Sequence, residues 1–263
     1  MICSAASCGR WVGVGVRYTD LRDFTGSRVD AENSSGDDVR ATEQPTRMHT
    51  DCQAGVITGC SGGFDNVLKL GLSLDTLDFE PDPYSGVLAQ AVAELSAKAL
   101  GSDFDYQRVT VSTSGYKMVF PNVARLVLAG RALYSMQFGN VPFFRVPTLA
   151  FDTGDRRGLG GFETMRGFVD RRFVGDSAVL VNAELRWSIF EGGYVWGQHL
   201  RPMLAPFVDA GRVFDGTQLR FDNWRADYGI GLRLIWNLVT TVSFDYGISS
   251  EGQIFQMALG YAF

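Results

Sequence analysis

Polar and apolar residues alternate strictly along residues 181–189, and this period of two limits what the segment can fold into. An extended strand places the polar residues on one face: Asn182, Glu184, Arg186 and Ser188. The other face is wholly apolar: Val181, Ala183, Leu185, Trp187 and Ile189. Such a strand needs water or charge partners on one side and hydrocarbon on the other.

The same alternation recurs in residues 227–236, 241–248 and 255–263, near the end of the chain. Aromatic residues lie towards the ends of their apolar faces, and the opposite faces carry small or polar residues. Strands of about ten residues with this pattern are typical of transmembrane barrels, whereas a water-soluble sandwich usually has shorter strands. The sequence therefore predicts an all-β, antiparallel transmembrane β-barrel.

The composition is consistent with a barrel and argues against two other classes of protein. The chain has 263 residues, of which 46% are hydrophobic, and its mean hydropathy is +0.01. No uninterrupted apolar stretch approaches the ~18 residues of a membrane helix. This excludes helical spans but not a barrel, since the lumen-facing half of each strand lowers the hydropathy. The net charge of -5 leaves no basic stripe for nucleic acid.

Taken in order, the chain contains about ten candidate strands separated alternately by short turns and longer connections, as in outer-membrane barrels. The strands are predicted at residues 10–18, 66–79, 87–100, 104–119, 124–138, 177–190, 202–214, 225–236, 240–249 and 253–263. Residues 87–100 also fit an amphipathic helix, because Val87, Ala91 and Leu95 are spaced by four. The strands on both sides favour a strand here.

Residues 19–65 have no periodicity and are rich in Asp, Ser, Thr and Gly, which predicts a long extracellular loop. The chain therefore divides into residues 1–65, a first strand with this loop, and residues 66–263, the barrel portion. Residues 1–9 have neither the basic nor the apolar region of a signal peptide. An outer-membrane protein needs an export signal. We therefore expect either that the sequence is a fragment whose true N-terminus lies upstream, or that its start was mis-assigned.

Cys52 and Cys60 lie in the polar loop, close enough to close a small ring, and form a candidate disulfide. The four cysteines of the chain allow three connectivities. No metal site is predicted, because neither cysteine pair has zinc-finger spacing and His49 and His199 have no companion motif. The isolated histidines also exclude a Ser-His-Asp arrangement, and nothing indicates a cofactor. We predict no enzymatic activity and no catalytic residue.

Four motifs occur in the order and strand register of a known family. They are Met165-Arg166-Gly167-Phe168, Gly175-Asp176, the segment Phe207-Val208-Asp209-Ala210-Gly211, and a terminal Phe263. Residues 66–263 thereby resemble the C-terminal barrel of the BamA/TamA family, the bacterial surface antigen family of outer-membrane assembly and secretion barrels. Residues 74–78 resemble an earlier strand-and-turn motif of these barrels, with Leu77 where the family often has Arg.

The resemblance implies a 16-stranded barrel in the outer membrane of a Gram-negative bacterium, with a loop, residues 139–176 here, folded back into the lumen. It places Arg166 against acidic groups of the wall, with Asp209 and Asp176 as expected partners, Gly167 in a tight turn and Phe168 beside it. The period of two independently puts Asp209 on one face with Phe207 and Gly211, and Glu184 on one face with Arg186. Phe263 would be the terminal signal that the barrel-assembly machinery recognises.

The chain also departs from the family. The soluble periplasmic repeat domains are missing, and only about ten of sixteen strands are present. We therefore expect a truncated C-terminal portion, a sheet that pairs with a second copy through its edges, or a reduced member. The resemblance implies insertion or translocation of client outer-membrane or secreted proteins within outer-membrane lipid. The alternative is a passive pore or structural barrel without client handling.

Overall fold

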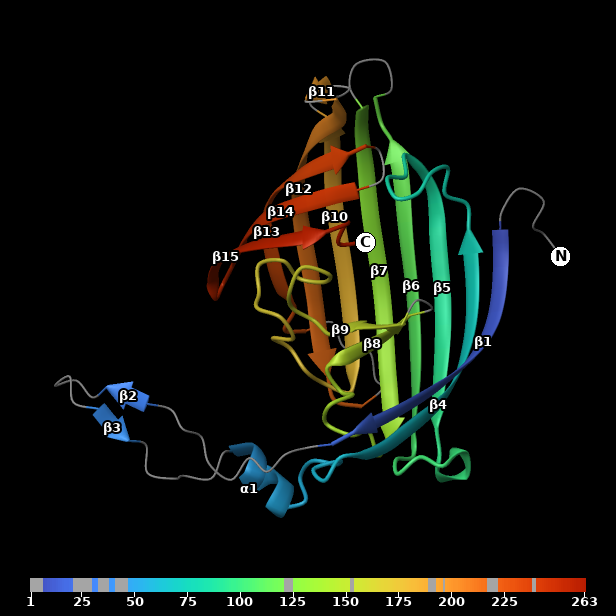
Figure 1. Ribbon diagram of the computed structural model, residues 1–263, viewed down its shortest axis with the longest axis vertical. Coiled ribbons are helices and arrows are strands. Elements are labelled where there is room, and N and C mark those ends of the chain that lie inside the picture. Colours follow the sequence, from blue (N-terminus) through green and yellow to red (C-terminus); the bar gives the residue numbers. More distant parts are fainter. Residues whose placement is uncertain are drawn as a thin grey trace.

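A computed structural model describes residues 7–20, 30–32, 38–40, 47–120, 125–151, 154–188, 193–195, 197–216, 222–237 and 240–263. Its main feature is one curved antiparallel sheet (Figure 1). The long strands, in their order across the sheet, are β1 (Ser7–Thr19), β4 (Gly63–Asp75), β5 (Ser85–Ser96), β6 (Tyr106–Met118), β7 (Arg125–Gly139), β10 (Ser177–Ser188), β12 (Gln198–Phe214), β13 (Arg225–Trp236), β14 (Thr240–Ser249) and β15 (Gly252–Leu259). The short strand β11 (Gly193–Val195) pairs with one end of β12. Each long strand pairs with its neighbours along the chain, as in an up-and-down barrel.

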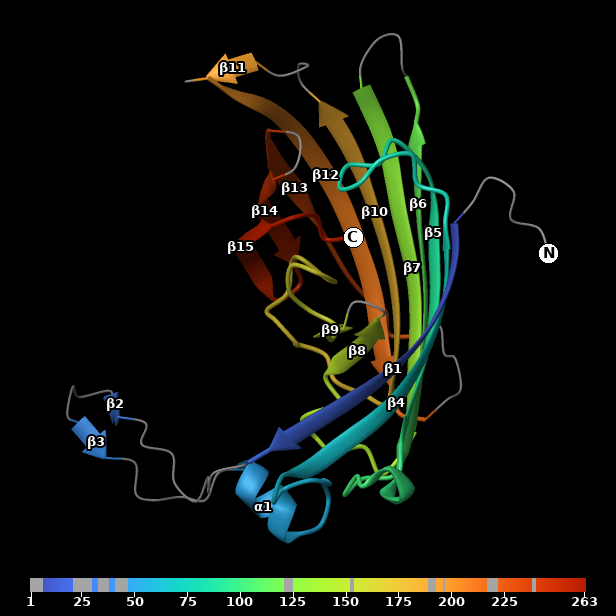
Figure 2. The same cartoon turned by 45° about the vertical axis from the view of Figure 1, so that its right-hand side comes forward.

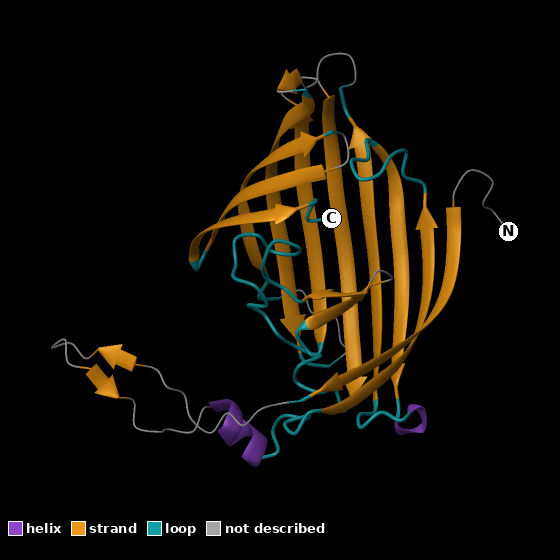
Figure 3. Ribbon diagram, viewed as in Figure 1, coloured by secondary structure: helices purple, strands orange, loops and turns teal. Residues whose placement is uncertain are grey.

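The predicted fold class is confirmed, including the strand at residues 87–100, most of which forms β5. Smaller elements occupy the connections (Figure 3). They are β2 (Asp30–Glu32), β3 (Asp38–Arg40), α1 (Arg47–Gln53), the 3-10 turn η1 (Lys98–Leu100), β8 (Thr148–Phe151) and β9 (Gly154–Arg157). Residues 21–29, 33–37 and 41–46 of the predicted polar loop lie outside the described residues. None of the described helices is long and apolar enough to cross a membrane.

Cys52, in α1, forms a disulfide bond with Cys60, eight residues further on. The two Cα atoms are 5.8 Å apart, within the usual range for such a bond. The bond closes the small ring that the sequence allows.

The two faces of the sheet differ as the alternation requires. Large apolar side chains on the convex face are exposed, among them Val14 at 77%, Leu72 at 58% and Leu259 at 78%. The concave face instead carries buried charged and polar side chains, including Arg108, Glu184 and Asp245. An apolar outer band around a polar interior is the pattern of a barrel that contacts lipid.

The sheet is open in the part of the chain that the structure describes. β1 pairs with β4, β15 pairs with β14, and no pairing joins β1 to β15 (Figure 2). Both edges therefore present unpaired backbone groups, which lipid does not tolerate.

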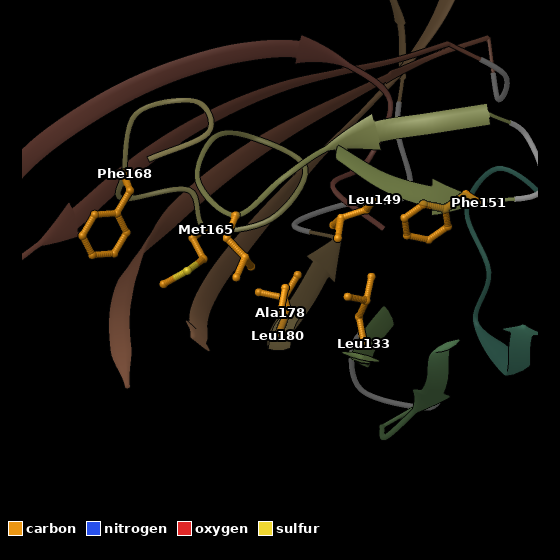
Figure 4. Packing of buried hydrophobic residues seen from close by; sticks show 8 residues of the cluster. Leu133, Leu149, Phe151, Met165, Phe168, Ala178 and Leu180 are labelled. Carbon is orange, nitrogen blue, oxygen red and sulfur yellow. The ribbon is translucent and has the colours of Figure 1, made fainter. Parts of the chain in front are cut away.

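The connection between β7 and β10, residues 140–176, lies on the concave face, and we call it the inner loop (Figures 1 and 2). It contains the hairpin of β8 and β9. Figure 4 shows how it packs onto the sheet through one buried apolar cluster, which comprises Leu133, Leu149, Phe151, Leu159, Met165, Phe168, Ala178 and Leu180. Leu133 of β7 and Leu180 of β10 are partners in register, so the wall offers the loop a continuous apolar strip.

Candidate functional site

Arg166, near the tip of the inner loop, is fully buried against β12. Its Nε donates to Asp209 Oδ2 at 2.8 Å and its Nη2 to Asp209 Oδ1 at 2.9 Å. The backbone N–H of Arg166 donates to the same carboxylate at 3.1 Å. The guanidinium also lies over the Phe207 ring, 3.6 Å from its centroid. This is the bidentate geometry that a buried arginine needs to offset its lost hydration.

Glu184 of β10 provides a second carboxylate, which accepts a hydrogen bond from Arg166 Nη1. The same carboxylate accepts from Arg186 Nε at 3.0 Å and from Arg233 Nη2 at 3.1 Å. Arg233, on β13, also donates from Nη1 to Asp245 Oδ1 of β14 at 2.7 Å. These groups, which we call the Arg166 cluster, connect the loop tip with four successive strands, β10, β12, β13 and β14.

The Arg166 cluster keeps its arginine charged. Burial lowers the pKa of the Arg166 guanidinium, but the charges of Asp209 and Glu184 more than offset this and raise the pKa above its ordinary value. Asn182 fixes the other side of Asp209, since its Nδ2 donates to Asp209 Oδ1 at 2.7 Å and to the Thr164 carbonyl at 2.6 Å. The loop and the wall are therefore joined by both charged and neutral hydrogen bonds.

The structure brings Arg166, Glu184 and Asp209 together but places Asp176 elsewhere, so its expected pairing with Arg166 is wrong. Asp176 lies just before β10, and its Oδ2 accepts a hydrogen bond from the Gly216 amide at 3.2 Å. Alternation could not reveal this, because Asp176 precedes the strand and has no face assigned by it. Of the other predicted residues, Phe168 enters the apolar cluster, and Gly211 lies beneath the loop.

Two glycines allow the loop tip to lie directly on the wall. A Cβ added to Gly167 would come within 2.5 Å of the Asp227 Cβ, and one added to Gly247 within 2.7 Å of both the Arg166 carbonyl oxygen and the Gly167 Cα. At Gly247 the backbone of the wall meets the backbone of the loop, and at Gly167 the loop backbone meets the Asp227 side chain, so neither position has room for a Cβ. Gly167 therefore allows the loop to approach the wall closely, and Gly247 on β14 allows the wall to accept the loop backbone at the same place.

Substituting Gly247 by alanine should displace the loop tip and destabilise the folded chain by about 1–3 kcal/mol, the usual cost of overpacking. Gly115→Ala is the matched control, because a Cβ at Gly115 of β6 would meet its nearest neighbour at 4.0 Å. The temperature at which the compact band of the refolded protein unfolds on an unboiled gel measures both variants. Equal temperatures for the two would contradict the close contact.

The last four residues leave the sheet. β15 ends at Leu259, Gly260 adopts a positive φ of 91°, and the chain turns onto the concave face. There the Phe263 carbonyl oxygen accepts from Arg186 Nη2 at 2.9 Å, and the Arg131 guanidinium lies 4.9 Å from the Phe263 ring centroid. The predicted strand to residue 263 is therefore too long, because inward-facing arginines bind this end of the chain.

A second ion-pair cluster, which the sequence did not reveal, holds the start of the inner loop. Arg145 lies between β7 and β8, and its Nε is 3.1 Å from Asp65 Oδ2 while its Nη2 is 3.2 Å from Glu94 Oε2. Its Nη1 contacts Asp155 of β9. We call this group, completed by Arg17, Lys69 and Arg108, the Arg145 cluster.

Lys69 joins the hairpin to the wall within this cluster, since its Nζ is 2.7 Å from Glu94 Oε1 and 2.8 Å from Asp155 Oδ1. Burial raises the pKa of the Asp155 carboxyl, but Arg145 and Lys69 outweigh this and hold the pKa below its usual range. The sequence feature that could have predicted this ion pair is the inward position of Lys69 and Glu94 on adjacent strands, where the two residues are partners in register.

These groups are charge partners for one another, and among the described residues no group of His, Cys, Asp and Glu could hold a metal ion. The arrangement fixes a loop inside a curved sheet.

Comparison with known proteins agrees with this geometry. The family model of the Omp85 superfamily domain matches residues 10–263. Among solved structures, the fold resembles the crystal structure of BamA from Haemophilus ducreyi lacking POTRA domains 1–3, with a TM-score of 0.64 and 17% identity. The match covers 98% of this chain and 52% of that chain, so the protein spans about half the length of its structural relative. No curated protein matches the sequence. Because the family model covers almost the whole chain, the protein belongs to the Omp85 superfamily of outer-membrane barrels, a family of non-enzymatic proteins involved in protein assembly and translocation.

Proposed function

We propose that this chain is the C-terminal barrel portion of a protein that inserts or translocates client proteins in the outer membrane. The observation that supports this is the Arg166 cluster, in which a buried loop arginine bridges Asp209 and Glu184 on adjacent strands. Such a cluster costs desolvation energy, and a passive wall gains nothing from it that apolar packing would not supply. We infer that the inner loop is fixed by Arg166 while the barrel acts on its clients, which would be unfolded outer-membrane or secreted proteins.

Within this proposal, residues 1–65 supply an edge strand and an extracellular loop, and residues 66–263 supply the barrel wall and the inner loop. The unpaired edges β1 and β15 are where further strands, or a second copy of the chain, would complete the wall. A gel run with and without boiling, calibrated for mass, distinguishes a chain that closes alone from a dimer. The resulting mass identifies the form to be used in functional tests.

The proposal predicts that lipid vesicles containing the refolded chain accelerate the folding of an unfolded eight-stranded outer-membrane barrel relative to empty vesicles. Arg166→Ala should abolish the acceleration, because the inner loop loses its anchor while the strands keep their pairing. The assay follows the heat-modifiable band of the client over time. Arg157→Ala, in the same loop but with a side chain 62% exposed, is the matched control and should retain the acceleration.

Ion conductance is measured in the same vesicles. Conductance without any effect on client folding would instead support the passive pore, and a conductance insensitive to Arg166→Ala would strengthen that alternative. A client folding rate equal to the rate in empty vesicles would refute client handling by this chain.

A further inference from the structure

The inner loop reaches the first free edge of the sheet through the Arg145 cluster. Arg17 of β1 directs its Nη2 to Asp155 Oδ2 of the loop hairpin at 3.0 Å. Its Nη1 is 3.6 Å from Asp65, which faces the same cluster from β4. The side chain of Arg17 is 46% exposed and that of Asp155 only 12%. The edge strand therefore contacts the loop directly, in addition to its pairing with β4.

The same loop reaches the opposite free edge at its tip. Gln256 of β15 donates from Nε2 to the Arg166 carbonyl at 2.8 Å and to the Phe168 carbonyl at 3.4 Å. Arg172 adds an ion pair at 2.6 Å to Glu251, in the turn between β14 and β15. The two Gln256 contacts use the backbone carbonyls on either side of Gly167, at the loop tip that the Arg166 cluster holds. Motion of β15 and motion of the loop tip are thereby linked.

Between the two contacts, residues 158–168 of the loop are held together by hydrogen bonds and apolar packing. The Thr164 hydroxyl accepts from the Gly160 amide at 2.9 Å, and its oxygen lies 3.0 Å from the Gly158 and Gly160 carbonyls. The Gly161 amide donates to the Met165 and Phe168 carbonyls at 3.1 Å each. Leu159, Met165 and Phe168 are buried in the apolar cluster. A segment with this many internal contacts transmits displacement, because packed interiors deform little.

We propose that the inner loop is a cross-brace that sets the separation of the two free edges, with Arg17–Asp155 at one end and Gln256 with the Arg166 and Phe168 carbonyls at the other. Figures 1 and 2 show the loop within the concavity, between the end of β1 and β15. Backbone pairing along ten strands leaves the distance between first and last strand to accumulated twist and coiling. A loop that contacts both β1 and β15 fixes the distance between these two strands. The brace acts on the sheet itself and holds whether or not the barrel handles clients.

The test is the distribution of distances between spin labels on the two edges in the full chain refolded into lipid. Labels at Val16→Cys and Met257→Cys point outwards, since these side chains are 73% and 67% exposed. Cys3 and Cys8 are replaced by serine, and labelled chain is diluted with unlabelled chain so that only distances within one copy contribute. The measured variants are Arg17→Ala, Gln256→Ala and the double variant.

A brace acts in series, so cutting either end is expected to broaden the distribution, and the double variant should be no broader than the broader single variant. Arg10→Ala on β1 and Gln253→Ala on β15 are matched controls. Arg10 shares its face with outward Val12 and Val14, and Gln253 contacts the Tyr246 hydroxyl. Both should keep the parent width. Unchanged widths in Arg17→Ala and Gln256→Ala would overturn the proposal, as would broadenings that add in the double variant.

Discussion

Arg166→Ala is expected to destabilise the folded chain by about 3–5 kcal/mol, the usual cost of removing one partner from a buried ion pair. The largest loss is expected at Asp209, because the substitution removes both hydrogen bonds from the guanidinium to this buried carboxylate, while Asn182 still donates to it. Glu184 retains Arg186 and Arg233. Denaturant titration of the refolded protein, followed by tryptophan fluorescence, measures the loss.

The partner of Arg166 is identified by a double-mutant cycle with Asp209→Ala. Each single variant leaves an uncompensated charge in the wall, whereas the double variant removes both charges, so we expect the double variant to cost little more than either single one. The coupling should reach the upper part of the ~0.5–3 kcal/mol range measured for residues in contact. Simple additivity would exclude an energetic coupling between Arg166 and Asp209.

Two further variants separate geometry from charge. Arg166→Lys keeps the charge but loses the planar fork that binds Asp209 at two points, so it should recover only part of the loss. Arg157→Ala removes an arginine of the same loop whose ion pair with Asp170 is exposed, and it should cost at most ~1 kcal/mol. An equal loss in Arg157→Ala would point to a general effect of loop charge.

Periodicity could predict the wall of this protein because side-chain direction in a strand depends only on position. Glu184, Asp209 and Lys69 all face inwards, as the alternation requires. The resemblance added the loop arginine, which no local pattern marks. Together they were sufficient for Arg166 with Asp209 but not for Asp176, which lies just before the first residue of β10.

The inner loop itself was not predictable in the same way. Its hairpin consists of two strands of four residues each, too short to leave a periodic signal. The position of the loop depends on contacts with β4, β5 and β6. The inward turn after Leu259 also depends on contacts with residues far away in the sequence. Alternation continues to Phe263, yet Arg131 and Arg186 bind the terminal carbonyls and the chain leaves the sheet. Tertiary contacts decided both cases.

The Arg145 cluster gives the second large effect, because it contains four cations and three carboxylates: Arg17, Lys69, Arg108 and Arg145 with Asp65, Glu94 and Asp155. Glu94 alone contacts three of the cations, and the side chains of Glu94 and Arg108 are fully buried. Glu94→Gln keeps the volume and removes the charge. We expect a loss of about 3–5 kcal/mol in the same titration, since two arginines would remain buried beside a neutral amide.

Charge compensation distinguishes this electrostatic cost from a packing defect. Lys69→Met removes one excess cation and keeps most of the side-chain volume, so the variant carrying both Lys69→Met and Glu94→Gln should be more stable than Glu94→Gln alone. Lys69→Met by itself should be destabilising, because Asp155 and Glu94 each lose a cation. Glu251→Gln, at an exposed turn, is the control for loss of a carboxylate and should change little. If removing Lys69 worsened Glu94→Gln, repulsion among the remaining cations would not be the cause, and the start of the inner loop would be held by shape instead.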